Sequence, residues 1–309
     1  MSRTRRPRVP RADLALDPEA VLRMLLAPVR SWRGFEPSRC EIAVLKRNER
    51  RIVARYDLWE GHATASVVGK WYSTDRGATV ADALDSLRNG ALDAPHSVPA
   101  LLLYEPDGRA LFVEWVEGTL LREEIRRDPA TAARAGGWLS AFHRSPLRTP
   151  RACGPDKQRR AVQRWTDDQP RLEGLAGDLA EALQALPYPG RPVHYDYYHS
   201  QVLLAEGRTV AIDLDESGLG DQSFDLAHFD AHLRLLALQW FADPTALSDA
   251  AVSFRDGYER GGGRADPPER RPALSAFAWF KLAHQRLRAG AALEADYALE
   301  AVRESLSRA

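Results

Sequence analysis

The chain has 309 residues, 44% of them hydrophobic and 28% charged, as in an ordinary globular protein, and it is long enough for one large or two modest domains. The 43 basic and 43 acidic residues balance, so the composition gives no support to nucleic-acid binding, which needs a basic face. No run of about 18 apolar residues occurs, so we expect no membrane-spanning helix.

The first 15 residues predict a disordered basic tail. The start, MSRTRRPRVPR, is rich in arginine and lacks the apolar run of roughly 7–15 residues that a secretory signal needs. An arm that binds nucleic acid or a membrane surface is the alternative. Cys40 and Cys153 match no metal-binding spacing and no disulfide framework, so we expect two small buried side chains and a cytoplasmic location.

Residues 16–117 predict an N-terminal nucleotide-binding lobe built on an antiparallel sheet. A helix should begin after Asp17, an expected N-cap followed by Pro18. Alternating apolar residues then predict strands, and the Asp107-Gly108 pair predicts a hairpin between the last two. The expected elements are a helix over 17–31, strands over 40–47, 51–59 and 64–72, a helix over 76–89 ended by Gly90, and strands over 98–106 and 110–116.

Residues 118–309 predict a mainly helical C-terminal lobe with one small β element over 193–216. The expected helices span 119–127, 130–144, 158–187 with a break, 223–241, 245–261 and 272–289. The predicted fold class is therefore α+β with two lobes, and ligand sites usually lie in a cleft between such lobes.

Asp196, Gln201 and Asp213 are the residues that best indicate chemistry. Phosphoryl transfer needs a carboxylate near the attacking hydroxyl and oxygen ligands for magnesium. A short hairpin with Gly207 at its turn would bring Gln201 and Asp213 close together, with Asp196 on the loop before them. Ordinary turn acids are the alternative, but Asp213 lies in the apolar stretch VAIDL, where an unpaired carboxylate would cost several kcal/mol.

The segment VHYDYYHSQVLL…VAIDLDESGLGDQSFDLAHF resembles the signature region of aminoglycoside phosphotransferases and choline kinases, and LSAFHRSPL (139–147) is similar to the family helix before it. The resemblance implies a protein-kinase-like bilobal fold over about residues 30–300. It also implies that Asp196 is the base for an acceptor hydroxyl. Gln201 and Asp213 would then hold Mg²⁺ on the phosphates of ATP, with GTP also possible.

Three further residues fit a nucleotide site of this kind. Lys70 lies inside a predicted strand, where it would reach the α- and β-phosphates; a strand-end lysine with its charge in solvent is the alternative. The stretch FVEWVEG (112–118) resembles a kinase hinge strand, so the C=O of Glu114 and the N–H of Val116 would face the adenine.

Three other residues should support the loop of Asp196. We expect His194 to brace the loop through hydrogen bonds rather than to do proton chemistry. Asp221 and Asp225 should accept hydrogen bonds from backbone N–H groups of that loop, and Asp225 could also cap a helix.

The sequence departs from the family pattern at several places. Tyr195 replaces the usual glycine, so the loop should have a backbone conformation that suits a side chain, and Gln201 replaces an asparagine. The turn Lys46–Arg51 contains no glycine to cradle phosphate, and helix 76–89 offers only Asp82 and Asp85 as partners for Lys70. A weak or inactive nucleotide-binding pseudokinase is therefore the alternative function.

The acceptor cannot be read from composition. Acidic and basic residues nearly balance over 222–309, which should line much of the acceptor pocket, so a strongly cationic acceptor is not favoured. A sugar, an amino alcohol or an antibiotic would fit equally well, and the oligomeric state is not readable.

Overall fold

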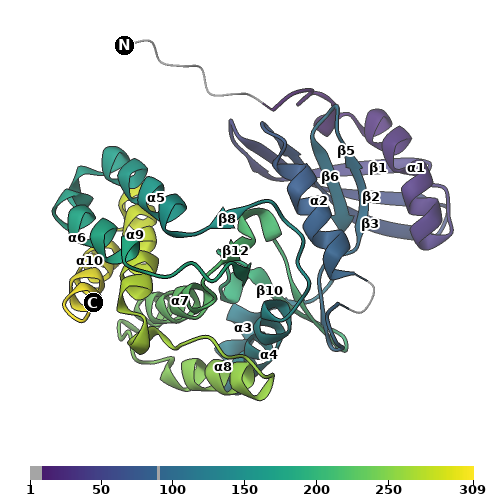
Figure 1. Cartoon of the computed structure of the whole chain (residues 1–309). Coiled ribbons are helices and arrows are strands. Elements are labelled where there is room, and N and C mark those ends of the chain that lie inside the picture. The colour runs from purple at the N-terminus through teal and green to yellow at the C-terminus, as the bar shows by residue number, and fades with distance from the viewer. Residues whose placement is uncertain (1–8, 89–90) are drawn as a thin grey trace, which may run out of the picture. The chain divides into compact units, whose positions relative to one another are not determined.

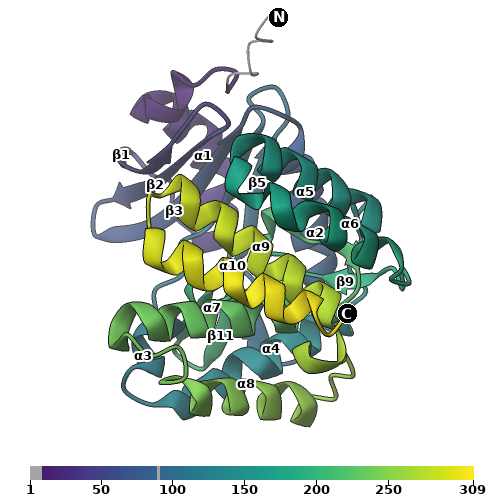
Figure 2. The same ribbon diagram turned by 90° about the vertical axis from the view of Figure 1, so that its left-hand side faces the viewer.

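The computed structural model describes residues 9–88 and 91–309 (Figures 1 and 2). The described residues divide into two compact units, which we call the sheet unit (9–88 and 98–117) and the helical unit (91–97 and 118–309). The predicted boundary between 117 and 118 is one of the positions at which the chain passes from one unit to the other. Residues 91–97 were expected in the N-terminal lobe but lie in the helical unit, because β4 (His96–Ser97) pairs in parallel with β11 (Arg208–Ala211).

The sheet unit is a five-stranded sheet with two helices. All neighbouring strands are antiparallel, in the order β1-β2-β3-β6-β5. The elements are α1 (Pro18–Arg33), β1 (Arg39–Arg47), β2 (Arg51–Glu60), β3 (Ala63–Tyr72), α2 (Arg76–Leu87), β5 (Leu101–Glu105) and β6 (Ala110–Glu114). Every predicted helix and strand of this region is present, although the predicted helix end at 89 and Gly90 lies outside the described residues.

Alternation of side chains explains how the sheet is covered. Along β2, every second residue from Ile52 to Leu58 is buried, and these residues form a core with Val21 and Leu25 of α1. Strand β6 is buried at all five positions, which requires cover on both faces, and α2 packs against β3, β5 and β6 (Figure 1). Asp17 caps α1 as predicted, since its carboxylate accepts from the N–H groups of Glu19 and Ala20.

The prediction of a disordered tail over 1–15 is wrong for the part that the structure describes. Val9 and Ala15 are buried in the core of the sheet unit. The Tyr56 hydroxyl donates to the C=O of Ala15 at 2.9 Å and accepts from Trp71 Nε1 at 2.9 Å. This buried hydrogen-bond chain holds the segment before α1 against the sheet. Residues 1–8 lie outside the described part.

The helical unit contains the remaining elements. Its helices are α3 (Leu121–Ile125), α4 (Ala132–His143), α5 (Pro155–Asp168), α6 (Glu173–Gln184), α7 (Ser223–Phe241), α8 (Ser248–Arg260), α9 (Pro272–Arg288) and α10 (Ala292–Leu306). Its short strands are β4, β7 (Thr119–Leu120), β8 (Ala152–Cys153), β9 (Arg191–Val193), β10 (Val202–Ala205), β11 and β12 (Gly218–Gly220). Helix α10 was not predicted, and residues 119–120 are a strand that pairs with β10 instead of the start of a helix.

Helix α7 is the centre of this unit. It is buried along most of its length, and it packs against α8, α9 and α10 (Figure 2). Because residues on nearly every side of α7 are buried, the helix needs cover all round, which explains why several helices surround it. Cys153 is buried here and Cys40 in the sheet unit, and neither forms a disulfide, so the predicted role of both cysteines as buried side chains is confirmed.

Candidate active site

The loop that carries Asp196 follows β9 and is held by Asp225 in the first turn of α7. The Asp225 Oδ2 accepts from the N–H of His194 at 2.7 Å, and its Oδ1 accepts from the N–H of Tyr195 at 2.7 Å. The predicted role of Asp225 is therefore confirmed. Asp221 differs from the prediction: its Oδ1 accepts from the N–H of Ser223 and so supports the start of α7.

Asp225 is completely buried and has a third partner. The Nε2 of His143, at the end of α4, donates to Asp225 Oδ2 at 3.0 Å, and the Nδ1 of His143 lies 2.9 Å from the Tyr258 hydroxyl of α8. Burial raises the pKa of Asp225, but the hydrogen bonds from the His143 ring and from the N–H of His194 outweigh it, so the pKa lies below its usual value. Helices α4, α7 and α8 thus fix the loop together.

His194 braces the loop through its backbone N–H, which donates to Asp225, so the predicted bracing by hydrogen bonds is confirmed. Both of its ring nitrogens are buried and have no hydrogen-bond partner among the described residues. The ring lies instead against the aromatic rings of Trp138, Phe142 and Tyr197 at centroid distances of 5.3–6.1 Å. Burial lowers the pKa of His194, so the ring is neutral and contributes packing.

Tyr195 has a backbone conformation that favours glycine. Its φ is +67°, in the left-handed region, where a side chain meets steric strain. The expectation of a loop geometry suited to a side chain is wrong. The two hydrogen bonds from the loop to Asp225 hold this conformation, and the ring of Tyr195 packs on Phe224 with centroids 4.7 Å apart.

Lys281 of α9 is the residue at this site that the sequence analysis missed. Its Nζ donates to Asp196 Oδ1 at 2.7 Å and to the C=O of Tyr195 at 3.0 Å. The side chain of Lys281 is 11% exposed and that of Asp196 is 26% exposed. A lysine within the apolar run AFAWFKLA (276–283) of this helix is the signal that could have indicated a buried partner.

Two histidines of α7 lie beside the same carboxylate. His228 Nδ1 donates to the C=O of Tyr197 at 3.1 Å, which leaves Nε2 as an acceptor, 3.8 Å from Asp196 Oδ1. His232 follows one turn later and stacks on Tyr198 at 4.0 Å. Burial is the main reason why the pKa of each ring lies well below its ordinary value of 6.5, so both histidines are neutral.

Gln201 and Asp213 stand at the same end of the β10–β11 hairpin, as the sequence predicted. Val202 pairs with Ala211, and the N–H of Ile212 donates to the C=O of Gln201 at 2.8 Å. Asp213 has a φ of +68°, and such outliers are common at functional sites. Carboxylate and amide oxygens suit a hard cation, so this pair fits magnesium. Among the described residues, no group of three or more His, Cys, Asp and Glu side chains could hold a metal ion.

The nucleotide-binding candidates lie in the sheet unit. Lys70 is half-buried near the end of β3, opposite Leu111 of β6. Glu114 ends β6, and its carboxylate accepts from the N–H of Ala100 at 3.1 Å. Val116 follows two residues later and is buried. The helical unit contains Asp196, Gln201 and Asp213. Three of the six predicted site residues therefore lie in each of the two units.

The turn between β1 and β2 is closed by a side chain. Asn48 Oδ1 accepts from the N–H groups of Arg50 and Arg51 at 2.9 and 3.0 Å, so these two donors are already used within the turn. Asp82 and Asp85 lie on the exposed side of α2 and make no ion pair with a described residue. Neither aspartate is therefore the partner considered for Lys70.

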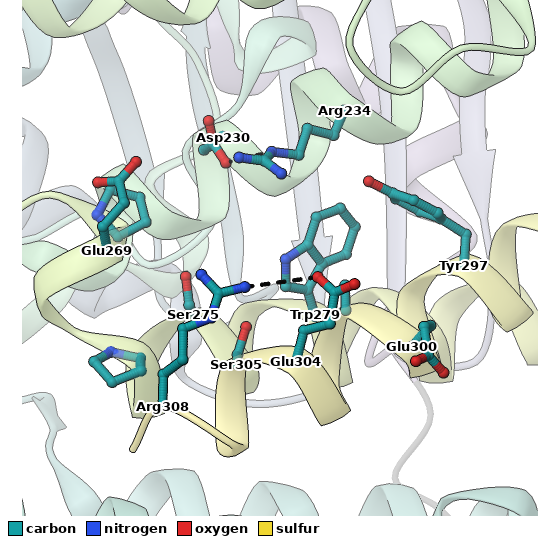
Figure 3. Close-up of a pocket in the computed structure, with 13 residues that line it drawn as sticks. Asp230, Arg234, Glu269, Ser275, Trp279, Tyr297, Glu300, Glu304, Ser305 and Arg308 are labelled. Carbon is teal, nitrogen blue, oxygen red and sulfur yellow. Dashed lines mark hydrogen bonds and ion pairs between the residues drawn. The ribbon is translucent and has the colours of Figure 1, made fainter.

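A separate cavity of about 150 Å³ lies between α7, α9 and α10 (Figure 3). Its lining includes Trp279, Tyr297 and the ion pair of Asp230 with Arg234 at 2.9 Å. None of the predicted site residues lines it. On α7 and α9, Asp230 and Trp279 are each two positions from His228 and Lys281, which puts them on nearly opposite helix faces. The cavity is therefore distinct from the site of Asp196.

Comparison with known proteins identifies the family. A family model described as the phosphotransferase enzyme family matches residues 67–273, about two thirds of the chain. The chain therefore belongs to the phosphotransferase enzyme family, and the predicted enzyme class, a small-molecule kinase, is confirmed. No curated protein matches the chain.

Solved structures show the fold. A choline/ethanolamine kinase family protein from Mesorhizobium loti has a TM-score of 0.62 at 16% identity, over 94% of this chain and 98% of that chain. The choline kinase LicA from Streptococcus pneumoniae has a TM-score of 0.62 at 14% identity, over 93% and 98%. A thermostable mutant of aminoglycoside phosphotransferase APH(4)-Ia, in a ternary complex with AMP-PNP and hygromycin B, has 0.59 at 17%, over 92% and 98%. The predicted α+β, kinase-like fold class is thereby confirmed.

Proposed function

We propose that this protein transfers a phosphoryl group from ATP to a hydroxyl group of a small molecule, with Asp196 as the base. The main support for the proposal is the way in which the loop that carries Asp196 is held. Asp225 holds the backbone N–H groups of both preceding residues, and the carboxylate of Asp196 remains partly exposed. A base must be held this firmly and still be reachable by a substrate.

The reaction needs little covalent chemistry from the protein. Asp196 orients the acceptor hydroxyl and takes its proton, the hydroxyl oxygen forms a bond to the γ-phosphorus, and the bond from that phosphorus to the bridging oxygen of ADP breaks. Gln201 and Asp213 would hold magnesium, which supplies positive charge to the phosphate oxygens. Lys281 keeps the carboxylate of Asp196 oriented from the side of α9.

Binding of the nucleotide is assigned to the sheet unit. Lys70 would contact the α- and β-phosphates, and the C=O of Glu114 and the N–H of Val116 would bind the adenine. Because the N–H groups of Arg50 and Arg51 already donate to Asn48 within the turn, we expect phosphate binding to rely on side chains. ATP is the expected donor and GTP remains possible: among the similar structures, one contains AMP-PNP and another, an aminoglycoside 2′-phosphotransferase mutant, contains GDP. We expect the enzyme to act in the cytoplasm, without nucleic acid.

Product formation tests this proposal. Purified protein would be incubated with ATP, Mg²⁺ and a panel of sugars, amino alcohols, hydroxy acids and antibiotics, and phosphorylated product would be detected by ³¹P NMR. Asp196→Asn should lower turnover about 10²–10⁴-fold. The exposed Glu206→Gln on the same unit is the control. Turnover that persists unchanged in Asp196→Asn would refute the role of Asp196. Magnesium-independent nucleotide binding without turnover would instead support a pseudokinase.

A further inference from the structure

Lys157, in the first turn of α5, lies close to the loop that carries Asp196. Its Nζ is 3.9 Å from the centre of the Tyr195 ring, and Tyr195 immediately precedes Asp196. An ammonium group at this distance from an aromatic face is attracted by the electrons of the ring. Tyr195 stands where the family pattern has a glycine, so this contact depends on a side chain that a glycine lacks.

The same ammonium group also contacts the turn that follows Asp213. Lys157 Nζ lies 3.6 Å from Glu216 Oε2, and Arg151 lies 3.7 Å from the same oxygen. Glu216 ends the turn Leu214–Glu216, which begins immediately after Asp213. One side chain therefore joins the residue before the proposed base to the turn after a proposed metal ligand.

A third contact fixes the position of Lys157. Its Nζ donates to Cys153 Sγ at 3.2 Å, and Cys153 belongs to β8, which pairs with β12. An ammonium group has three N–H donors, so the thiol, the carboxylate and the ring can each be met by one of them. The Lys157 side chain is 23% exposed. Its charge is therefore held among protein groups rather than free in solvent.

The turn after Asp213 is itself ordered, so it transmits a shift at its end. Arg151 donates to the C=O of Asp215, and the N–H of Ser217 donates to the C=O of Leu214 at 3.0 Å. The loop on the other side of Lys157 is equally well held, through the hydrogen bonds of its backbone described above. Lys157 thus connects two ordered segments, and a displacement of one segment reaches the other through it.

We propose that Lys157 is a positioning residue that couples the base to the metal site, because it holds the Asp196 loop and the Asp213 turn in one relative arrangement. Phosphoryl transfer depends on this arrangement, since the acceptor hydroxyl and the metal-bound phosphate must meet in line, and an error of about 1 Å can cost about 10²-fold in rate. The kinetic part of the inference rests on the proposed function, whereas the coupling itself is measurable without it.

Hydrogen exchange tests the coupling without turnover. Exchange of the full chain would be followed by mass spectrometry on peptides that cover 193–197, with peptides of α8 as the reference for global opening. Lys157→Met should speed exchange of the loop about tenfold. Glu216→Gln should speed it about threefold, through the weakened ion pair with Lys157, and should add nothing in the Lys157→Met protein. Arg160→Met, at an exposed position of the same helix, is the control.

The exchange rates decide the coupling by themselves. Unchanged exchange of the loop in Lys157→Met would overturn the proposal, and so would the same acceleration in Arg160→Met. An effect of Glu216→Gln that persists in the Lys157→Met protein would also overturn it, because the effect would then travel along β12, which pairs with β9. Lys157→Arg keeps a cation that stacks on aromatic rings and should exchange like the wild type.

Steady-state kinetics then measure what the coupling contributes to catalysis. Lys157→Met should lower kcat about tenfold while the KM for ATP stays constant, and Lys157→Arg should recover most of kcat. A change confined to the KM for ATP, or equal loss of kcat in the methionine and arginine variants, would contradict the positioning role and leave the proposed phosphotransferase intact. If the exchange rates show the coupling but no acceptor reacts, the proposed function fails and the coupling stands.

Discussion

Lys281 Nζ lies 2.7 Å from Asp196 Oδ1, which joins α9 to the loop that carries the proposed base. The same ammonium group donates to the C=O of Tyr195 at 3.0 Å, so it fixes both the carboxylate and the backbone just before it. The residues of this ion pair are 85 positions apart in the chain. The orientation of Asp196 therefore depends on the position of α9 as well as on its own loop.

Lys281→Met should reduce activity more than binding. The substitution leaves the carboxylate of Asp196 and the C=O of Tyr195 without their donor, so kcat should fall about tenfold or more while the KM for ATP is unchanged. The free energy of unfolding should fall by about 1–3 kcal/mol. Steady-state kinetics and urea denaturation measure the two effects. Lys281→Arg keeps the charge and should recover part of kcat; equal activity of the methionine and arginine variants would argue against this role.

Substitutions at Tyr195 should reveal the strain in the loop. Within helices and strands, a protein with alanine at a given position is usually more stable than the same protein with glycine there, by about 0.5–1 kcal/mol. Because Tyr195 has a φ of +67°, Tyr195→Gly should be more stable than Tyr195→Ala by about 1–2 kcal/mol. Both variants lose the buried ring that packs on Phe224, at a cost of about 3–5 kcal/mol, so both should be less stable than the wild type. Chemical denaturation of the three proteins provides the test, and a more stable alanine variant would contradict the strain.

Stability should fall as the pH decreases below 6.5. The pKa of His232 is lowered in the folded state, so the unfolded chain binds a proton that the folded chain does not. The stabilisation is complete above the unfolded pKa near 6.5, and it is lost below it at up to about 1.4 kcal/mol per pH unit for this group. His232→Phe preserves the stack on Tyr198 and should reduce the slope of unfolding free energy against pH by about one proton between pH 6 and 5. An unchanged slope would show that His232 is not buried in its neutral form.

Gln201 should control how magnesium is held. Gln201→Leu removes the amide oxygen, so the Mg²⁺ concentration for half-maximal activity should rise about tenfold or more. Gln201→Asn keeps an amide oxygen and should therefore need less Mg²⁺ for half-maximal activity than the leucine variant. A magnesium titration of phosphoryl transfer measures this. Gln163→Leu, at an exposed position of α5, should behave as the wild type. If Gln201→Leu also behaves as the wild type, the metal is held without this residue.

Local sequence signals predicted much of the fold. Helix α7 spans 223–241 as expected, because its apolar residues and its start after a turn are local features. The first three strands agree within one residue at each end. In the second and third strands, buried residues alternate with less buried ones, and this pattern is visible in the sequence. Helix α10 was not predicted, although its apolar periodicity is also a local feature.

The sequence by itself determined the order of Asp196, Gln201, Asp213 and Asp225, and this order was enough to indicate a kinase. Their roles depend on a short loop and a hairpin, which nearby residues encode. Only the tertiary structure decided which distant side chains complete the site. Lys281 and His143 lie on helices that are far from Asp196 in the chain, and their contacts follow from helix packing. The strain at Tyr195 has the same origin, because Asp225 on another element holds its backbone in a conformation that the residue alone disfavours.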